Sequence, residues 1–132
     1  MEIITYVISG QLEHQDSMGN GSIIRAGEFQ RMSAGTGITH SEFNPSKSEL
    51  VHLYQIWIEP SQRGIPPSYE QKMFSPDQKR NQLCLVASQE GKLGSLKINS
   101  EVNLYIAQVD READLKCSCS PDRSSWIQVL SG

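Results

Sequence analysis

The side chains best suited to chemistry lie in Gly-Thr-Gly-Ile-Thr-His-Ser-Glu-Phe-Asn, where His40 and Glu42 are two positions apart. This stretch is typical of a β-strand, whose side chains alternate between two faces, so His40 and Glu42 should point the same way. Imidazole and carboxylate together suit divalent iron, manganese, nickel or copper. The pair therefore predicts part of a transition-metal site.

A site of this type needs at least one further ligand, usually a second and a third histidine. The chain contains two other histidines, His14 and His52. Alternation puts His14 on one face with Leu12 and Asp16, and His52 on one face with Tyr54. We interpret both as hydrogen-bonded strand histidines rather than ligands, because polar groups in half-buried sheets are usually paired.

The elements that must position these residues are strands, because the hydrophobic pattern has a period of two nearly throughout. Gly, Asn and Pro turn signals separate short runs rich in Ile, Val, Tyr, Phe and Trp. The expected strands are residues 2–9, 11–16, 22–25, 29–33, 38–43, 50–58, 83–87, 95–98, 102–109 and 126–130. Their even spacing predicts an all-β antiparallel sandwich or barrel.

Two further segments are expected to interrupt the strands. A helix is favoured only near residues 75–81, where Pro76 suits the first helical position after a Ser75 cap. Residues 63–67 contain Gly64 and two prolines, which cannot continue a strand in mid-sheet, so a loop is expected there.

The length of 132 residues suffices for one domain with a core and is too short for two complete barrels. The net charge is -3, and twelve Lys and Arg are scattered along the chain, so we expect no direct nucleic-acid binding. No apolar stretch approaches the roughly 20 residues of a membrane span, and the start lacks a signal-peptide pattern. We expect a soluble cytoplasmic protein without a membrane partner, and three cysteines, an odd number, agree with a reducing compartment.

The cysteines offer a second candidate site. Cys117-Ser118-Cys119 could bind a soft metal or sense oxidation, but it lacks the second cysteine pair that zinc sites require. We interpret it as an exposed loop with two ordinary thiols, and Cys84, between two leucines, as a small buried hydrophobe. The chain has no Gly-x-Ser-x-Gly nucleophile motif and no phosphate-binding glycine loop, so hydrolase and nucleotide-binding functions have no support.

Longer motifs resemble a known family. Gly37-x-x-His40-x-x-x-Asn44 resembles the second signature of the cupin barrels, and Glu2 with the strand up to Gly10 resembles the end of the first. Residues 1–7, 12–20, 32–42, 53–58 and 67–71 together are similar to the pirin family, a match that covers essentially the whole chain. The resemblance implies a cupin-type β-barrel, an RmlC-like jelly roll of antiparallel sheets.

The resemblance also implies a metal centre. Pirins are double cupins whose amino-terminal barrel holds one metal through a His-Pro-His dyad, a His and a Glu, and the last two match His40 and Glu42. The dyad would fall just upstream of Met1, so we expect two of the four ligands here. Iron is the expected metal, with manganese, nickel and copper as alternatives, and the site is expected to be weak or empty. Glu2 could join it or be frayed at the terminus.

The resemblance divides the chain into two parts. Residues 1–74 would be the remainder of the amino-terminal cupin barrel, and residues 75–132 a connecting segment and the opening strands of a second cupin repeat, within one compact unit. Residues 5–10 and 127–132 both form an apolar run ending in Ser-Gly, a faint repeat that agrees with this division.

The last segment, residues 115–132, is expected to cover an open sheet edge, either within the chain or by exchange in a symmetric homodimer. Aligning the two Ser-Gly ends places Ser118 and Ser120 where the dyad falls in the first repeat. A slip of one residue would place Cys117 and Cys119 there instead.

Two functions follow from the resemblance. A metal-dependent oxygenase of the quercetin 2,3-dioxygenase type would hold a flavonol-like small molecule at the metal, with Glu42 as ligand and base. A binding protein would present a metal-containing barrel to a protein partner, as proposed for pirins acting as transcriptional co-regulators. Affinity from His40 and Glu42 alone should fall below that of a four-ligand site, so we expect a metal-binding protein that is weakly or not catalytic.

Overall fold

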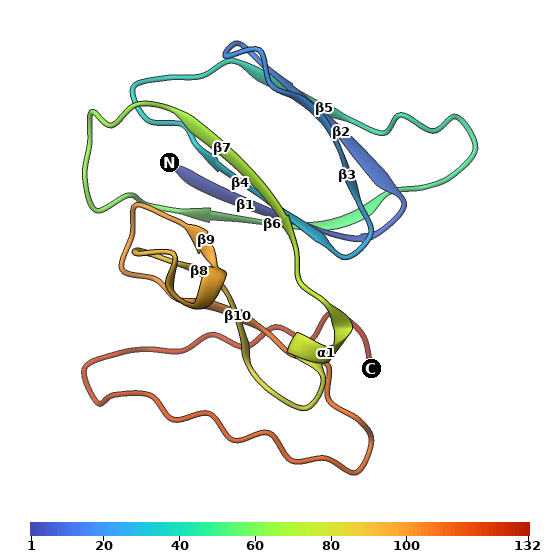
Figure 1. Ribbon diagram of the computed structural model, residues 1–132, viewed down its shortest axis with the longest axis vertical. Coiled ribbons are helices and arrows are strands. Elements are labelled where there is room, and N and C mark those ends of the chain that lie inside the picture. The colour runs from blue at the N-terminus through green and yellow to red at the C-terminus, as the bar shows by residue number, and fades with distance from the viewer.

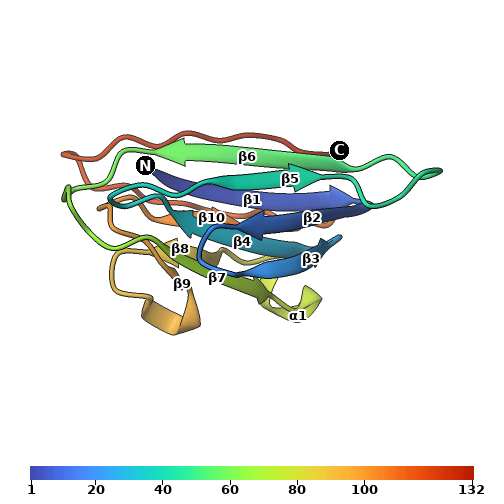
Figure 2. The same ribbon diagram turned by 90° about the horizontal axis from the view of Figure 1, so that it is seen from above.

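Two antiparallel sheets from the first 73 residues lie against each other as layers in the computed structural model, which describes all 132 residues (Figures 1 and 2). The larger sheet has the order β6-β1-β4-β7 and the smaller the order β3-β2-β5. Their strands are β1 (Glu2–Ser9), β2 (Gln11–Asp16), β3 (Gly21–Arg25), β4 (Glu28–Ser33), β5 (His40–Phe43), β6 (His52–Ile58) and β7 (Ser68–Met73). The predicted all-β fold is confirmed.

A third sheet, also of three strands, covers the outer face of the larger one. It contains β8 (Cys84–Ser88), β9 (Leu96–Lys97) and β10 (Leu104–Ile106) in the order β10-β8-β9, and β8 and β9 are its one parallel pair. Strand β7 leads to it through α1 (Pro76–Lys79), and the short 3-10 helix η1 (Lys92–Gly94) joins β8 to β9. The division of the chain after residue 74 stays a prediction.

Both faces of the two central strands of the larger sheet, β1 and β4, are mostly buried, because their residues alternate between two cores. Ile4 and Phe29 point to the third sheet, where they join an outer core with Phe74, Cys84, Val86, Ala87, Leu96 and Ile98. Val7 points the other way and forms an inner core with Leu12 and Ile24. Each Val, Leu, Ile or Phe side chain in these cores stabilises the fold by about 1.5 to 3 kcal/mol relative to full exposure. Thr5 and Gln30 lie on the same face of the larger sheet as Val7, so this face carries polar residues next to the apolar ones of the inner core.

Glu2 lies at the junction of the larger sheet with the small one. Its side chain is fully buried, and its Oε2 accepts hydrogen bonds from Ser33 Oγ at 2.8 Å and from the backbone N–H of Asn99 at 3.0 Å. Glu2 is therefore neither frayed nor part of the barrel interior. It connects β1 to the segment after β9.

The predicted helix and loop are confirmed. Ser75 caps α1 with a capping box that includes Gln78, and Pro76 occupies the first turn. Residues 59–67 contain no strand. None of the helices has the length and apolar character needed to cross a membrane.

Most predicted strands are present, two of them with the predicted bounds, but one strand was missed. Strand β7 (Ser68–Met73) has the sequence Ser-Tyr-Glu-Gln-Lys-Met, which shows no apolar alternation. Its inward residues Tyr69 and Gln71 bond other polar side chains inside the barrel. A strand that faces a polar interior lacks the pattern by which strands are recognised in a sequence.

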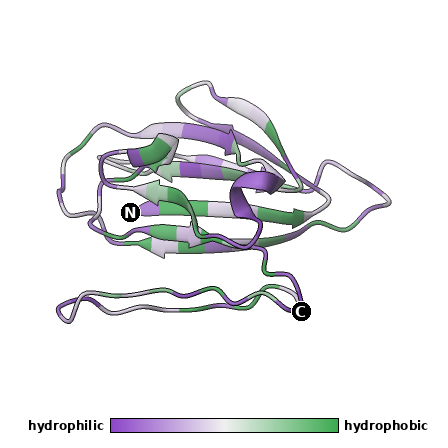
Figure 3. Ribbon diagram, turned by 60° about the horizontal axis from the view of Figure 1, so that its bottom comes forward, coloured by the Kyte–Doolittle hydropathy of each residue, from purple (hydrophilic) through white to green (hydrophobic).

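The predicted strand at residues 126–130 is wrong. Trp126 and Ile127 are 86% and 83% exposed, and no residue after 110 forms a backbone hydrogen bond to a strand. Figures 1 and 3 show this part of the chain as a long loop apart from the sheets. An apolar alternating run forms a strand only where another strand completes its hydrogen bonds.

Residues 115–132 therefore do not close a sheet edge in this chain, and that expectation is wrong. The side-chain contacts that hold this loop are few: Tyr54 donates to Gln128 Oε1 at 3.3 Å, and Arg123 Nη2 donates to the carbonyl of Glu101 at 2.6 Å. Exchange of the segment between two chains stays a prediction.

Candidate metal centre

One layer of polar side chains crosses the interior between the two large sheets. In the larger sheet, Thr5 lies opposite both Gln30 and Gln55 on its neighbouring strands. In the smaller sheet, His14 lies opposite both Glu42 and Ser22. The inner core lies next to this layer along the strands, so the polar groups rest against closely packed apolar side chains.

The predicted site residue Glu42 points into this layer. Its Oε1 accepts a hydrogen bond from Gln30 Nε2 at 2.5 Å, and its Oε2 accepts one from Gln55 Nε2 at 2.9 Å. The side chain is 16% exposed. The carboxylate is therefore anchored through both oxygens inside the barrel.

The other predicted site residue, His40, lies one step nearer the rim, at the first residue of β5 and opposite Asp16. It is exposed, and its ring centroid is 5.8 Å from that of His14. His40 and Glu42 occupy the same face of β5, as alternation along a strand requires.

His14 is buried on the neighbouring strand β2, close to both predicted site residues, although its sequence pattern predicts a paired histidine outside the site. Its Nε2 is 3.1 Å from Asp16 Oδ2, as expected of a hydrogen-bonded strand histidine. Because an ionised carboxylate only accepts, Nε2 carries the hydrogen, and in the neutral ring Nδ1 keeps a lone pair. Nδ1 is buried without a hydrogen-bond partner and lies 3.8 Å from Glu42 Oε1.

Asp16 accepts a hydrogen bond from Nε2 of His14, the ring nitrogen that faces away from Glu42. Desolvation opposes its charge, yet hydrogen bonds from the side chains of Asn20 and His14 and from the backbone N–H groups of Asn20 and Met18 lower its pKa. Its side chain has no exposed surface. The carboxylate thus stays charged and fixes the His14 ring.

We expect the free energy of unfolding to fall less steeply at acid pH in Asp16→Asn than in the wild type. The pKa of Asp16 in the folded state lies below its unfolded value of about 3.9. The charged carboxylate therefore stabilises the fold fully above about pH 3.9, and this stabilisation is lost as the pH falls through the folded pKa. Urea unfolding between pH 2 and 7 should show wild type losing its advantage over the variant only at the acid end. An advantage that is equal at all pH values would contradict the assignment.

Tyr69 closes the layer on the side of β7. Its ring stacks on His14 with centroids 4.7 Å apart, and its hydroxyl is 2.6 Å from Ser22 Oγ. Burial, together with the negative charges of Glu42, Asp16 and Glu28, raises the pKa of Tyr69, although the bond to Ser22 opposes this. The phenol therefore remains a hydrogen-bond donor.

These residues fit a divalent transition metal in their donor chemistry. His40 and His14 offer imidazole nitrogens and Glu42 offers carboxylate oxygens, the set that suits iron, nickel, copper and manganese. Nδ1 of His14 is a buried potential metal ligand that has no hydrogen-bond partner inside the protein. However, no three or more His, Cys, Asp or Glu side chains converge closely enough to form a closed site.

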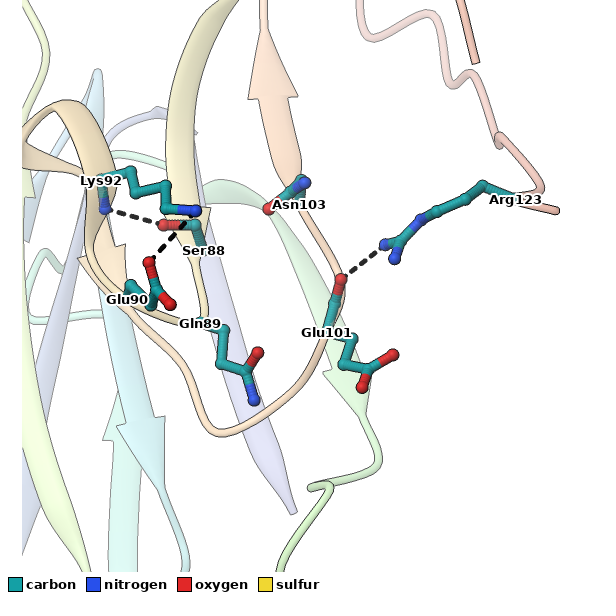
Figure 4. Close-up of a pocket in the computed structure, with 7 residues that line it drawn as sticks. All are labelled: Ser88, Gln89, Glu90, Lys92, Glu101, Asn103 and Arg123. Atoms are coloured by element: carbon teal, nitrogen blue, oxygen red, sulfur yellow. Dashed lines mark hydrogen bonds and ion pairs between the residues drawn. The ribbon is translucent and has the colours of Figure 1, made fainter. Parts of the chain in front are cut away.

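The remaining candidates lie elsewhere. His52 is exposed at the start of β6, opposite Ser9, where β1 ends. A polar pocket of about 230 Å³ lies beside β8, and Figure 4 shows two of its cations already paired: Lys92 with Glu90, and Arg123 with the carbonyl of Glu101. Its lining residues are Ser88, Gln89, Glu90, Lys92, Glu101, Asn103 and Arg123. None comes from the two large sheets.

The three thiols should differ in reactivity. Burial raises the pKa of Cys84, with a smaller opposing effect of Lys79, whereas Cys117 and Cys119 are exposed. Since the thiolate is the reactive form, a disulfide reagent at pH 7.5 should modify two cysteines quickly and the third only after unfolding. Mass spectrometry of the modified peptides checks the assignment; rapid modification of Cys84 would contradict its burial in the outer core.

Comparison with known proteins identifies relatives of this chain. The family model described as Pirin matches residues 1–58, and the model described as the Quercetinase C-terminal cupin domain matches residues 85–132. The quercetin 2,3-dioxygenase of Escherichia coli K12 is 49% identical over 132 residues, which are 100% of this chain and 56% of that protein. A putative quercetin 2,3-dioxygenase of Pasteurella multocida is 46% identical over 134 residues, with the same coverage. The chain thus spans about half the length of these relatives.

Solved structures agree with these matches. YhhW from Escherichia coli has a TM-score of 0.74 and 56% identity, covering 79% of this chain and 43% of that one. The structure described as bacterial pirin YhhW in complex with nickel(II) has a TM-score of 0.72 and 55% identity, covering 80% and 44%. The predicted cupin-type β fold is confirmed.

Proposed function

Because the chain belongs to the pirin family, as its family matches and its similarity to quercetin 2,3-dioxygenase show, we propose that it is a metal-binding cupin protein. The site that we propose is built on His40 and Glu42. One observation supports it most: the Glu42 carboxylate is held inside the barrel beside a buried, unpartnered imidazole nitrogen of His14, with His40 on the same face.

Each residue has a distinct part in this proposal. His40 offers an imidazole at the exposed rim, and Glu42 offers an anchored anionic oxygen below it. His14 is fixed by Asp16 and offers Nδ1. A bound divalent metal would supply Lewis acidity to an oxygen-containing ligand. Iron is the metal implied by the resemblance, and nickel is the metal in the complex of the relative YhhW.

We propose further that the residues of this chain by themselves support weak catalysis or none. They match two of the four ligands expected for the family, and fewer protein ligands should weaken metal binding. The alternative is a quercetin 2,3-dioxygenase-type oxygenase acting on a flavonol-like molecule, which the names of the relatives favour. Glu42 would be the base in that reaction. A protein partner and a strand-exchanged homodimer also stay predictions.

Titration of the metal-free protein with Ni²⁺, Mn²⁺ and, without oxygen, Fe²⁺ tests the proposal by calorimetry. We expect one metal per chain, lost in Glu42→Ala and kept in the control Glu13→Ala, since Glu13 lies on the opposite face of β2. Oxygen uptake with quercetin on the loaded protein then separates the two functions. Binding without turnover supports our proposal, turnover above the free-metal rate supports the oxygenase, and no binding refutes both.

A further inference from the structure

Two glutamine side chains hold the Glu42 carboxylate, and they come from strands on either side of β1. Gln30 lies in β4 and Gln55 in β6, and both are opposite Thr5 in register. Their Nε2 atoms also approach Thr5 Oγ1, at 3.5 Å and 3.1 Å. One threonine thus lies between two amides, each of which donates to a different oxygen of Glu42.

The direction of the Gln55 amide is set by an aromatic donor. Trp57 Nε1 donates to Gln55 Oε1 at 2.9 Å, and an indole N–H can only donate. Gln55 Oε1 must therefore face Trp57, which leaves Nε2 to face Glu42. A flipped amide would place its oxygen against the carboxylate and its NH₂ against the indole, so both hydrogen bonds would be lost.

A second aromatic residue, Tyr69, lies within hydrogen-bond distance of the Gln30 amide oxygen. The Tyr69 hydroxyl lies 3.3 Å from Gln30 Oε1 and 3.1 Å from Gln71 Oε1, so its one hydrogen is shared between two acceptors. The Ser22 hydroxyl lies 2.6 Å from the phenol oxygen, and it donates to that oxygen when the phenol hydrogen points to the amides.

We propose that Gln30 and Gln55 are positioning residues of the metal centre, and that Trp57 and Tyr69 set the direction of their amides. We call these four residues the amide clamp. It fixes both oxygens of Glu42 from the side of the larger sheet, and Oε1 also lies 3.8 Å from Nδ1 of His14, whose ring stacks near that of His40. Mutation of polar residues that orient a metal ligand commonly lowers metal affinity roughly 10- to 100-fold. The role toward a metal rests on the function proposed above.

The clamp also connects the barrel interior to the rim. Trp57 is 62% exposed, whereas Gln30 is fully buried. A change at Glu42 should therefore be detected at the Trp57 indole through Gln55. The chain has two tryptophans, and Trp126 in the terminal loop is 86% exposed, which makes it an internal reference.

Hydrogen exchange of the two indole N–H groups tests the clamp without metal. In the metal-free protein the Trp57 signal, assigned with Trp126→Phe, should exchange about five- to tenfold more slowly than the Trp126 signal, the factor that one net hydrogen bond provides. This protection should disappear in Gln55→Leu and persist in Gln15→Leu. Gln15 is a matched control because it also donates to a carboxylate, that of Glu13 at 3.1 Å, on the exposed surface.

Titration with Co²⁺ tests the role of the clamp toward a metal. We expect Gln55→Leu and Gln30→Leu to raise the Co²⁺ dissociation constant about 10- to 100-fold and to change the visible absorption of the bound ion. Trp57→Phe keeps an aromatic ring and removes the indole N–H donor, so it should act in the same direction with a smaller effect. Gln15→Leu should change neither the affinity nor the spectrum.

The outcomes separate the clamp from the proposed function. If wild type binds no Co²⁺, the metal function fails, and equal exchange rates of the two indoles would then overturn the clamp as well. If wild type binds Co²⁺ and Gln55→Leu binds it equally with an unchanged spectrum, the clamp is refuted and the metal function stands. Protection that Gln55→Leu abolishes, with weaker and spectrally altered binding, supports both.

Discussion

Replacing His40 by alanine should raise the dissociation constant for Ni²⁺ at least about 100-fold and leave the protein folded, because loss of a direct ligand should cost no less than loss of a residue that orients one. His40 is exposed and forms no hydrogen bond through its ring, so its removal leaves no buried group unsatisfied. A histidine with a purely structural role would behave differently. Its loss would cost about 1 to 3 kcal/mol if a buried partner remained unpaired.

The third histidine provides the matched control. His52 is exposed as well, but it lies at the start of β6, away from Glu42. His52→Ala should bind Ni²⁺ like wild type, as measured by calorimetry, and both variants should keep the wild-type urea midpoint. Unchanged binding in His40→Ala would show that our site assignment is wrong, and joint loss of metal and fold would indicate a structural role.

Replacing Gly35 by alanine should destabilise the fold by about 2 to 5 kcal/mol, a large part of the stability of a small domain. Gly35 has a φ of +54°, a conformation that costs a residue with a Cβ roughly 1 to 2 kcal/mol. The added Cβ would also lie against the carbonyl oxygen of Ile65 and 2.6 Å from the backbone nitrogen of Pro67. Overpacking against rigid backbone adds about 1 to 3 kcal/mol.

Two other glycines separate strain from collision. Gly27 has a φ of +89° with open space around it, so Gly27→Ala should cost only the conformational part, about 1 to 2 kcal/mol. Gly21 has neither a positive φ nor a neighbour within 4 Å, so Gly21→Ala should change stability by less than about 0.5 kcal/mol. Urea unfolding of all three variants checks the ranking. Equal losses at Gly35 and Gly27 would show that the backbone around Ile65 yields to the methyl group.

The sequence by itself determined the all-β fold and the shared face of His40 and Glu42. Both depend on a local rule, the period of two along a strand, which needs no knowledge of neighbours. The helix start at Ser75 was readable for the same reason, since a cap is satisfied within four residues. The resemblance to the pirins also rests on local motifs, and the relatives confirm it.

Strand partners and the lining of the barrel were decided only by the tertiary structure. Strand β7 was missed because its inward residues are polar, and residues 126–130 were assigned a strand for which the chain provides no partner. His14 reads as an ordinary paired histidine until the fold brings its free Nδ1 beside Glu42, which is 28 positions later in the chain. Gln30 and Gln55 carry no motif, because an amide acquires a role only from what it faces. Register across three strands supplies that information, and hydrogen bonds between distant strands are not encoded in any single segment.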